Sequence, residues 1–504
     1  MLPVLAYGGV AGFLSGVVVS LFNYIATILT RYSNQIYSYV GEHLAFIPLL
    51  FGGLIVLALL MSALHHKIPQ VRGSGIPQTE GVLRGLVTFK WLRVLVGTIV
   101  GSFISFFAGL SVGSEGPSVQ IGAATAQGAS ELLRSRLAWQ RYVITGGASA
   151  GLAVAFNAPL TGIIFSLEEA HRRFTPMILM SSASSVIFAT VTYHFMTRLW
   201  GGKPGLIFDM GEINYIPVNL LWLLVIVGIV CGVCAIFFNF ALINSQKALD
   251  KKTKNFPYWA RLIVVFVLTG VVGLLLPIVN GGGHSLIEQV ANMDFSLQML
   301  LLILVVKFIM VLFCFNSGAT GGLFIPMLAF GALIGGICGQ IFIACGLDPS
   351  LYKAIVCISM TTFFGASVRA PITAVVLIVE LTGYSTSFLS TAIAIFTAYL
   401  VAELLGNKPI YDSMLARFCR SENKGKEFKE VSLEVEVKLD AFLVGKAIGD
   451  VLWPSNCLVT AIVREKEEIV PDGEVRIKAG DKLLIIAQTA DSEKTYDFIK
   501  GLAS

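Results

Sequence analysis

The sequence predicts an all-α polytopic membrane protein that carries a small α+β domain at its C-terminal end. Hydrophobic residues make up 55% of the 504 positions and charged residues only 13%, against about 25% in soluble domains. So apolar a chain would expose large apolar patches to water, whereas a lipid bilayer requires apolar outer faces. The net charge of +5, from 36 basic and 31 acidic residues, is too small and too scattered for a nucleic-acid-binding surface.

Long runs without a charged residue give the second observation. A spanning helix needs about 20 apolar residues, and each run reaches that length, at 1–30, 43–66, 94–114, 142–167, 174–197, 213–246, 262–287, 308–347 and 381–402. Three shorter runs, 116–130, 354–368 and 370–379, are predicted to be half-helices that stop inside the membrane. Irregular backbone at that depth requires protein or a watery cavity around it, so broken helices indicate a transport pathway.

An internal repeat gives the third observation. The segment 158–168 reads APLTGIIFSLE, and the segment 212 positions later, 370–380, reads APITAVVLIVE. Two related halves with broken helices are the usual construction of transporters. We expect the halves to be inverted, although matching letters alone do not give their orientation.

The chain changes character after Glu403. We expect a transmembrane transport domain over 1–411, a charged linker over 412–429 and a separate domain over 430–504. The alternation of residues predicts strands at 431–437, 457–464 and 482–487, a short helix at about 445–452 and a helix from about 491.

The cysteines and acidic residues do not suggest an enzyme. The eight cysteines show neither a disulfide nor a zinc pattern. Glu168, Glu169 and His171 could suggest an intramembrane metalloenzyme, but there is no H-E-x-x-H motif and no second ligand cluster. We therefore expect no enzyme, no metal site and no cofactor.

Gly- and Pro-containing motifs are typical of anion sites. They read GSGIP at 73–77, GSEGP at 113–117 and GGLFIP at 321–326, and a late tyrosine, Tyr411, follows GNKPI at 406–410. Gly frees the backbone and Pro begins helices, so these motifs create helix N-termini, whose free N–H groups attract anions without a full positive charge. The hydroxyls of Ser74 and Tyr411 can donate further hydrogen bonds.

Together, in this order and at this spacing, the motifs resemble the CLC family of chloride channels and chloride/proton antiporters over most of 1–411. The resemblance implies that Ser74 and Tyr411 bind the central chloride with the backbone N–H groups of Leu323 and Phe324. It also implies that the N–H groups of Glu115 and Gly116 line a neighbouring external site. Glu115 would be the gating glutamate, and a carboxylate at an anion-binding helix terminus can also carry a proton.

The adjacent glutamates Glu168 and Glu169 are predicted to have different roles, one structural and one functional. Glu168 repeats as Glu380 and is interpreted as structural, whereas Glu169 aligns with the intracellular proton-relay glutamate of CLC antiporters. A solvated helix end is the alternative for Glu169. Two departures from the family, Ser114 before the gating glutamate and Gln78 after GSGIP, concern ion affinity.

The expected function is therefore that of a homodimeric secondary transporter exchanging chloride for protons in a bacterial plasma membrane, with multiple spans and a cytoplasmic tail. A passive, voltage- or ligand-gated chloride channel is the alternative, which Glu169 disfavours. The tail resembles the TrkA-C type of regulatory domain, particularly at AGDKLLII, 479–486. The resemblance implies that such domains pair and that some bind cyclic di-AMP, or another nucleotide, where they pair; a dimerisation module without a ligand is the other possibility.

Overall fold

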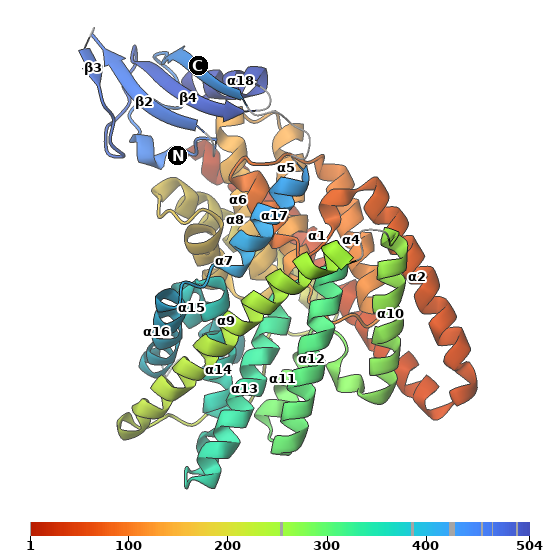
Figure 1. The fold of residues 1–504 in the computed structure, drawn as a ribbon. Coiled ribbons are helices and arrows are strands. Elements are labelled where there is room, and N and C mark those ends of the chain that lie inside the picture. Colours follow the sequence, from red (N-terminus) through yellow and green to blue (C-terminus); the bar gives the residue numbers. More distant parts are fainter. Residues whose placement is uncertain are drawn as a thin grey trace.

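Helices fill most of the molecule, and a small sheet domain lies at one end of them (Figure 1). The structure is a computed structural model that describes residues 2–252, 256–384, 388–422, 429–454, 457–465, 467–489 and 492–504. Within these ranges, eight helices are long and apolar enough to cross a membrane. The predicted class, a polytopic helical membrane protein with a small α+β tail, is confirmed.

The first half of the membrane domain contains eight α-helices. They are α1 (Leu2–Glu42), α2 (Ile47–Lys67), α3 (Ile76–Leu83), α4 (Trp91–Phe107), α5 (Glu115–Leu132), α6 (Leu137–Phe156), α7 (Pro159–Phe165) with the π-helical η3 (Ser166–Ala170), and α8 (Pro176–Leu199). Short 3-10 turns η1 (Leu44–Phe46) and η2 (Pro69–Val71) join some of them.

The second half repeats this order with different lengths. Its helices are α9 (Leu221–Lys252), α10 (Tyr258–Leu275), α11 (His284–Ala291), α12 (Leu297–Ser317), α13 (Phe324–Ala344), α14 (Tyr352–Val368), α15 (Pro371–Thr382) and α16 (Phe388–Leu404). The 3-10 turns η4 (Val218–Leu220), η5 (Pro277–Val279) and η6 (Pro349–Leu351) precede α9, α11 and α14.

Two of the long uncharged runs are divided where a left-handed residue ends a helix. Asn157 (φ 48°) ends α6 and Gly318 (φ 80°) ends α12, so the uncharged runs 142–167 and 308–347 each hold two helices. The run 354–368 belongs to α14, which begins at Tyr352. Together with the preceding 3-10 turn η6 it is long and apolar enough to cross a membrane, which differs from the half-helix predicted there. Lys353, in the first turn of α14, donates from its amine to the carbonyl of Met210 at 2.6 Å.

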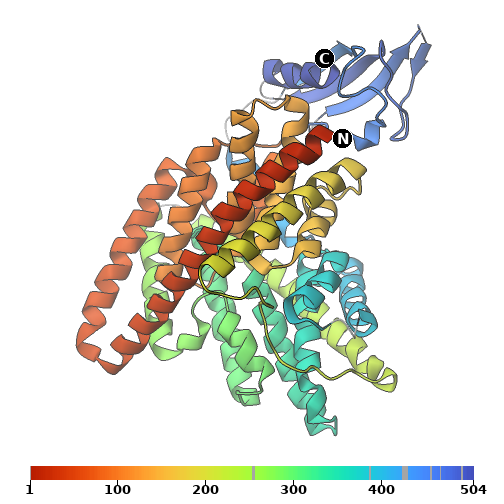
Figure 2. The ribbon, with the colours of Figure 1, turned by 180° about the vertical axis from the view of Figure 1, so that it is seen from behind.

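The two halves are inverted relative to each other. Helix α5 runs toward the tail domain, since its C-terminus leads into α6, whose Ala138 packs in the core of the tail. Helix α13 runs the opposite way, to the far end of the molecule (Figure 1). Seen from behind, α1 (red) runs from beside the tail to the far end of the molecule, while most of the second half (green to cyan) lies away from the tail (Figure 2).

The tail is a four-stranded antiparallel sheet with one helix. The strands β1 (Lys429–Glu436), β2 (Cys457–Arg464), β3 (Glu467–Ile469) and β4 (Lys482–Thr489) pair in the order β1-β4-β2-β3, and α18 (Ser492–Ala503) follows. The predicted helix at 445–452 is wrong, because only the 3-10 turn η8 (Ile448–Asp450) forms. Gly445 has φ 80°, and the N–H of Gly449 donates to Gly473 outside the segment.

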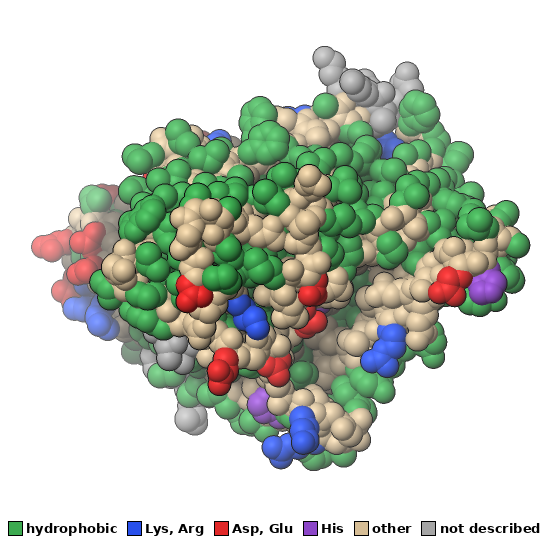
Figure 3. Space-filling view, turned by 90° about the horizontal axis from the view of Figure 1, so that it is seen from below, with side chains coloured by type: hydrophobic (Ala, Val, Ile, Leu, Met, Phe, Trp, Pro, Cys, Tyr) green, Lys and Arg blue, Asp and Glu red, His purple; other side chains and the backbone are tan. Residues whose placement is uncertain are grey.

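The tail rests directly on the membrane domain. The Tyr142 hydroxyl of α6 donates to the carbonyl of Asp450 at 3.0 Å, and Arg141 donates to the carbonyls of Leu452 and Trp453. Helix α17 (Ile410–Glu422) links the two parts, so it crosses the boundary expected between 411 and 412. The face turned away from the tail carries many apolar side chains, and its acidic and basic side chains gather mainly over one half and the edges (Figure 3).

Candidate functional site

Two helix N-termini meet at the centre of the membrane domain. Gly113 and Gly322 form an antiparallel bridge, with the N–H of Gly113 donating to the Gly322 carbonyl at 2.7 Å and the reverse bond at 2.6 Å. Helix α5 begins two residues after Gly113, and α13 begins two residues after Gly322. The first N–H groups of both helices therefore lie close together, where two helix dipoles present their positive ends.

The Glu115 carboxylate lies at this meeting point. It is buried, and its Oε1 accepts a hydrogen bond from the Ser114 hydroxyl at 3.2 Å. Its Oε2 lies where a Cβ atom on Gly113 would be, and the backbone N–H of Ile325 in α13 is close to the carboxylate. No side chain or backbone group in the described residues bonds Oε2. The side chain thus occupies a position suited to an anion.

Ser74 comes from the loop that precedes α3. Gly73 and Gly75 flank it with φ of 91° and 86°, a left-handed region that favours glycine. The Ser74 carbonyl packs so tightly on Gly116 that a Cβ atom on Gly116 would overlap it. The Ser74 hydroxyl is fully buried and has no hydrogen-bond partner among the described residues.

Tyr411 is a second buried hydroxyl group without a described hydrogen-bond partner. Its ring lies in α17 and is fully buried, and its hydroxyl has no partner among the described residues either. The hydroxyl lies close enough to the carboxyl groups of Glu115, Glu169 and Glu80 to interact electrostatically with all three. Buried hydroxyls normally bond something, so two donors without a protein partner fit a site for an anion.

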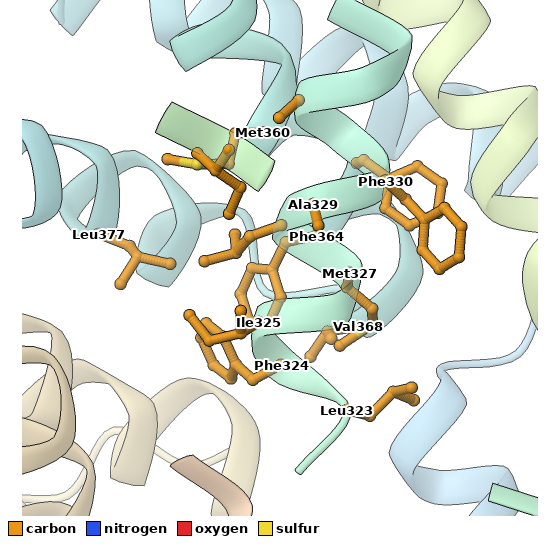
Figure 4. Close-up of a cluster of buried hydrophobic side chains, with 14 of the residues drawn as sticks. Leu323, Phe324, Ile325, Met327, Ala329, Phe330, Met360, Phe364, Val368 and Leu377 are labelled. Atoms are coloured by element: carbon orange, nitrogen blue, oxygen red, sulfur yellow. The ribbon is translucent and has the colours of Figure 1, made fainter. Parts of the chain in front are cut away.

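Leu323 and Phe324 begin α13 beside Gly322. The first backbone bond of the helix joins the N–H of Met327 to the Leu323 carbonyl, so the N–H groups of Leu323 and Phe324 precede the intrahelical ladder. The Phe324 ring packs against Phe364 of α14 and Phe156 of α6, with centroids 4.1 and 4.7 Å apart. Figure 4 shows this apolar packing around the start of α13, which fixes the N-terminus in place.

An arginine-lined cavity lies beside the Ser74 loop on the side of the tail. It has a volume of about 240 Å³, and Arg72, Arg261 and Arg417 line it together with Gly73 and Gly318. Gly73 is joined to this wall by a hydrogen bond from its N–H to the Gly318 carbonyl at 3.1 Å. Basic side chains in a concave entrance concentrate anions, so the cavity is suited to feed the Ser74 position.

The two adjacent glutamates of η3, Glu168 and Glu169, have different surroundings. Glu168 accepts hydrogen bonds at the start of α15, from the N–H groups of Ile372 and Thr373 and from the Thr373 hydroxyl, at 2.6 to 3.0 Å. Glu380 does the same at the start of α7, accepting from Leu160 and Thr161 at 2.7 to 2.8 Å. Both contacts agree with the interpretation of Glu168 as structural.

Glu169 points elsewhere and is buried. Neither of its carboxylate oxygens has a hydrogen-bond partner among the described residues. The α-helix expected around the pair is a π-helix instead, closed by a bond from the N–H of His171 to the Ser166 carbonyl. Wider turns of this kind often mark functional positions.

Sequence reasoning missed the charged cluster beside Glu169. Glu80 of α3 is buried near it and forms an ion pair with Arg84 at 3.4 Å. Asp412, next to Tyr411, joins Arg84 at 3.1 Å and Arg172 at 2.6 Å. Two neighbouring carboxylates repel each other when both are ionised, so Glu80 and Glu169 together can hold a proton. The four-residue spacing of Glu80 and Arg84 was the available signal.

A second missed residue is the buried Lys307 of α12. Its amine donates to the carbonyls of Val279 and Gly281 at 2.8 and 2.6 Å. The following glycine, Gly282, packs on Gly113 and on the Val112 carbonyl. The Lys307 amine thus supports the loop behind the Gly113–Gly322 bridge. A charged residue in an otherwise apolar helix was the signal in the sequence.

Nothing in the described residues supports the metalloenzyme alternative. No group of three or more His, Cys, Asp or Glu side chains there could hold a metal ion. His171 bonds the Thr145 hydroxyl at 2.7 Å, and the cysteines are all free thiols.

The sequence and the fold were compared with those of known proteins. A model of the family described as voltage gated chloride channel matches residues 52–403. The chain belongs to this family, known as CLC. A model of the TrkA-C domain matches residues 433–500, so both resemblances inferred from the motifs are confirmed.

Relatives are similar over most of their length. The H(+)/Cl(-) exchange transporter ClcA of Citrobacter koseri is 36% identical over 375 residues, which cover 73% of this chain and 79% of the relative. The ClcA of Klebsiella pneumoniae is 33% identical over 425 residues, covering 82% and 89%. The crystal structure of a slow cyanobacterial Cl-/H+ antiporter matches with a TM-score of 0.76 and 30% identity, over 84% of this chain and 99% of that one.

Proposed function

We propose that this CLC protein exchanges chloride for protons across the membrane. The observation that carries the proposal is the Glu115 carboxylate, held between the N-termini of α5 and α13 with one oxygen left without a described partner. The names of similar proteins support it, since they are H(+)/Cl(-) exchange transporters. At an anion site, an ionised carboxylate takes the place of chloride, and a protonated one can leave.

The chloride route begins at the cavity lined by Arg72, Arg261 and Arg417. Chloride next binds the hydroxyls of Ser74 and Tyr411 and the backbone N–H groups of Leu323 and Phe324. Further out, it competes with the Glu115 carboxylate for the N–H groups of Glu115 and Gly116. Neutral donors bind the ion without holding it as tightly as a buried cation would, so release stays fast.

Protons need a second route on the tail side. Hydroxyl and N–H donors stabilise an anion but offer no strong proton acceptor, so protons do not follow chloride through this site. Glu169, paired with Glu80, is the acceptor on that side. Tyr411 lies within electrostatic reach of Glu169 and Glu115, so the region around its ring connects the two carboxyl groups.

A passive channel is the alternative function. A channel requires the anion route and a gate but no buried proton acceptor on the tail side. The burial of Glu169 without a described hydrogen-bond partner therefore favours exchange over passive conduction, and opposes the solvated helix end considered for this residue.

We propose a cytoplasmic tail and a homodimer. Basic residues mark the tail side, with Arg134 and Arg136 in the loop between α5 and α6 and Arg172 and Arg173 after η3, and cytoplasmic loops are enriched in Lys and Arg. The TrkA-C match supports a regulatory role for residues 430–504. Pairing of two tails would create the place where the resemblance puts cyclic di-AMP.

Reconstitution into liposomes tests the exchange. With opposed chloride and proton gradients, we expect chloride to drive protons uphill. Glu115→Gln mimics the protonated carboxyl without titrating, so chloride flux should persist while its dependence on protons disappears. Chloride flux that never moves protons in the wild type would establish the channel instead. Normal proton pumping by the variant would disprove the role of Glu115.

A further inference from the structure

A second cavity lies between the tail and the membrane domain. It has a volume of about 580 Å³, and residues of both parts line it. The membrane side contributes Arg84, His171, Arg172 and Arg173, and the tail contributes residues 448–449 and 452–454, part of β2 and the turn 471–473. Binding sites for small molecules have volumes of about 300 to 1,000 Å³ and occur preferentially between domains.

The membrane side of this cavity is basic. Arg172 forms an ion pair with Asp412 through one guanidinium nitrogen, which leaves its other nitrogens for a further acceptor. Arg173 is exposed and also lines the cavity. The one carboxylate of the lining, Asp472, accepts the N–H groups of Glu474 and Val475 through a single oxygen, Oδ1. Three arginines, Arg84, Arg172 and Arg173, face this one carboxylate, so the lining is basic on balance.

The tail side of the cavity is apolar and contains a fixed aromatic ring. Trp453 is half-buried, and its indole N–H donates to the Ile448 carbonyl at 2.9 Å, which holds the ring in one orientation. Leu458 is 66% exposed although it belongs to β2, and Pro454 lies beside them in the lining. A flat apolar wall opposite two guanidinium groups suits a ligand with a ring at one end and phosphate at the other.

We propose that this cavity binds a nucleotide, with its phosphate on Arg172 and Arg173 and its base against Trp453 and Leu458. A guanidinium group can bind two phosphate oxygens at once through two parallel hydrogen bonds. The volume of the cavity accommodates one nucleotide. The site is formed by one chain alone and faces the membrane domain, so it differs from a site formed where two tails pair.

The position of the site suggests what the nucleotide does. Arg172 holds Asp412 at 2.6 Å, and Asp412 directly follows Tyr411 in α17. Arg172 also follows η3, which carries Glu169, so this ion pair ties the proton-accepting segment to the helix of Tyr411. A phosphate that competes for Arg172 changes this tie. This regulatory role rests on the proposed exchange function, whereas the binding itself does not.

Calorimetry on the full-length protein in detergent tests the binding. We expect AMP to bind. Adenosine, which lacks the phosphate, and inorganic phosphate, which lacks the base, should each bind more weakly. Arg173→Gln should weaken AMP binding roughly tenfold, since it removes a charged hydrogen bond to phosphate, and Trp453→Leu should also weaken it. Arg134→Gln, an exposed arginine outside the cavity, is the control. The site is disproved if AMP gives no heat at millimolar concentration, or if Arg173→Gln binds it as the wild type does.

Flux in proteoliposomes tests the regulation separately. AMP on the tail side should change the exchange rate of the wild type but not that of Arg173→Gln, whose rate without AMP should equal that of the wild type. An unchanged wild-type rate at saturating AMP would overturn the regulatory role while the binding result stands. Absence of any exchange would count against the proposed function and not against the site.

Discussion

The two halves of the membrane domain share their backbone but not their chemistry. Three-residue loops with positive φ at both ends, 73–75 and 281–283, precede the eight-residue helices α3 and α11. Helices α5 and α13 begin two residues after the bridged Gly113 and Gly322. The repeated features are thus those that end and begin helices.

At matched positions the side chains differ in kind. Gly282 takes the place of Ser74, Phe324 that of Glu115, and Leu381 that of Glu169. The first half supplies hydroxyl and carboxyl groups, and the second supplies backbone N–H groups and apolar walls. An inverted repeat thus builds a symmetric frame, and departures from the repeat make the route asymmetric.

One pair of residues keeps the symmetry. Glu168 and Glu380 each accept hydrogen bonds from the first turn of the other half's helix, α15 and α7. The carboxylates of Glu168 and Glu380 are half-buried and satisfied, whereas the oxygens of the buried Glu169 have no hydrogen-bond partner among the described residues. The comparison separates carboxylates that hold the fold from carboxylates available for protons.

The largest effect is expected at Glu169, which the second half replaces by Leu381. Glu169→Gln should abolish proton movement, because an amide cannot take up and release the proton, while chloride flux continues through untouched ligands. Paired measurements of proton and chloride flux in proteoliposomes check this. Glu131→Gln, at the exposed end of α5, is the matched control and should behave as wild type. A Glu169→Gln protein that still drives protons uphill would place the proton entrance elsewhere.

Selectivity should change at Ser74, whose counterpart is Gly282. Ser74→Pro removes a hydroxyl donor from the buried loop, and we expect the preference to shift from chloride toward nitrate by several-fold, as expected for about 1 kcal/mol of hydrogen bonding. Competition between the two anions in a flux assay measures the ratio. Ser102→Ala removes another buried hydroxyl without a described partner, in α4, and should leave the ratio unchanged. If Ser74→Pro also leaves it unchanged, Ser74 does not contact the anion.

Stability should depend equally on the two halves at Glu168 and Glu380. Replacing either by Gln leaves one acceptor oxygen for two backbone donors and should cost about 1–3 kcal/mol. Thermal unfolding of the two purified variants measures this, and similar losses are expected because the contacts are reciprocal. Coupling of protons to chloride should persist in Glu168→Gln. A large stability difference between the variants would break the proposed equivalence of the halves.

The smallest effect is expected at Asp481 in the tail, a buried carboxylate with partners. Burial opposes its ionisation, but hydrogen bonds from Arg464 and from the N–H of Lys478 outweigh burial and hold the pKa of Asp481 below its usual range. Its contribution to stability is therefore complete above the ordinary pKa of about 3.9 and is lost as the pH falls through the lower folded value.

Asp481→Asn should accordingly weaken the tail by about 1 kcal/mol at pH 7, and the difference from wild type should shrink below about pH 4. Hydrogen exchange of β2 and β4 in the full-length protein, corrected for intrinsic rates, measures this. An unchanged difference at low pH would show that the ionised carboxylate is not what stabilises the turn.

The sequence by itself determined the features that depend on nearby residues. Uncharged runs marked the spans, and Gly and Pro marked the starts of α3, α5 and α13, because helix termini follow from local backbone preferences. Strands β1, β2 and β4 followed from alternation of residues. The same local reasoning misplaced a helix at 445–452, where bonds to the distant Gly473 fix the backbone instead. It also took Lys353 as the end of an apolar run.

The tertiary structure decided everything that joins distant parts of the chain. The bridge between Gly113 and Gly322, the exchange of caps by Glu168 and Glu380, and the meeting of Glu80 with Glu169 each join residues that are far apart in sequence. Motifs indicate which residues can bind an anion or carry a proton, but they do not show which other residues those groups face. That depends on how inverted halves pack, since only packing brings the helix N-termini and the buried carboxylates to one point.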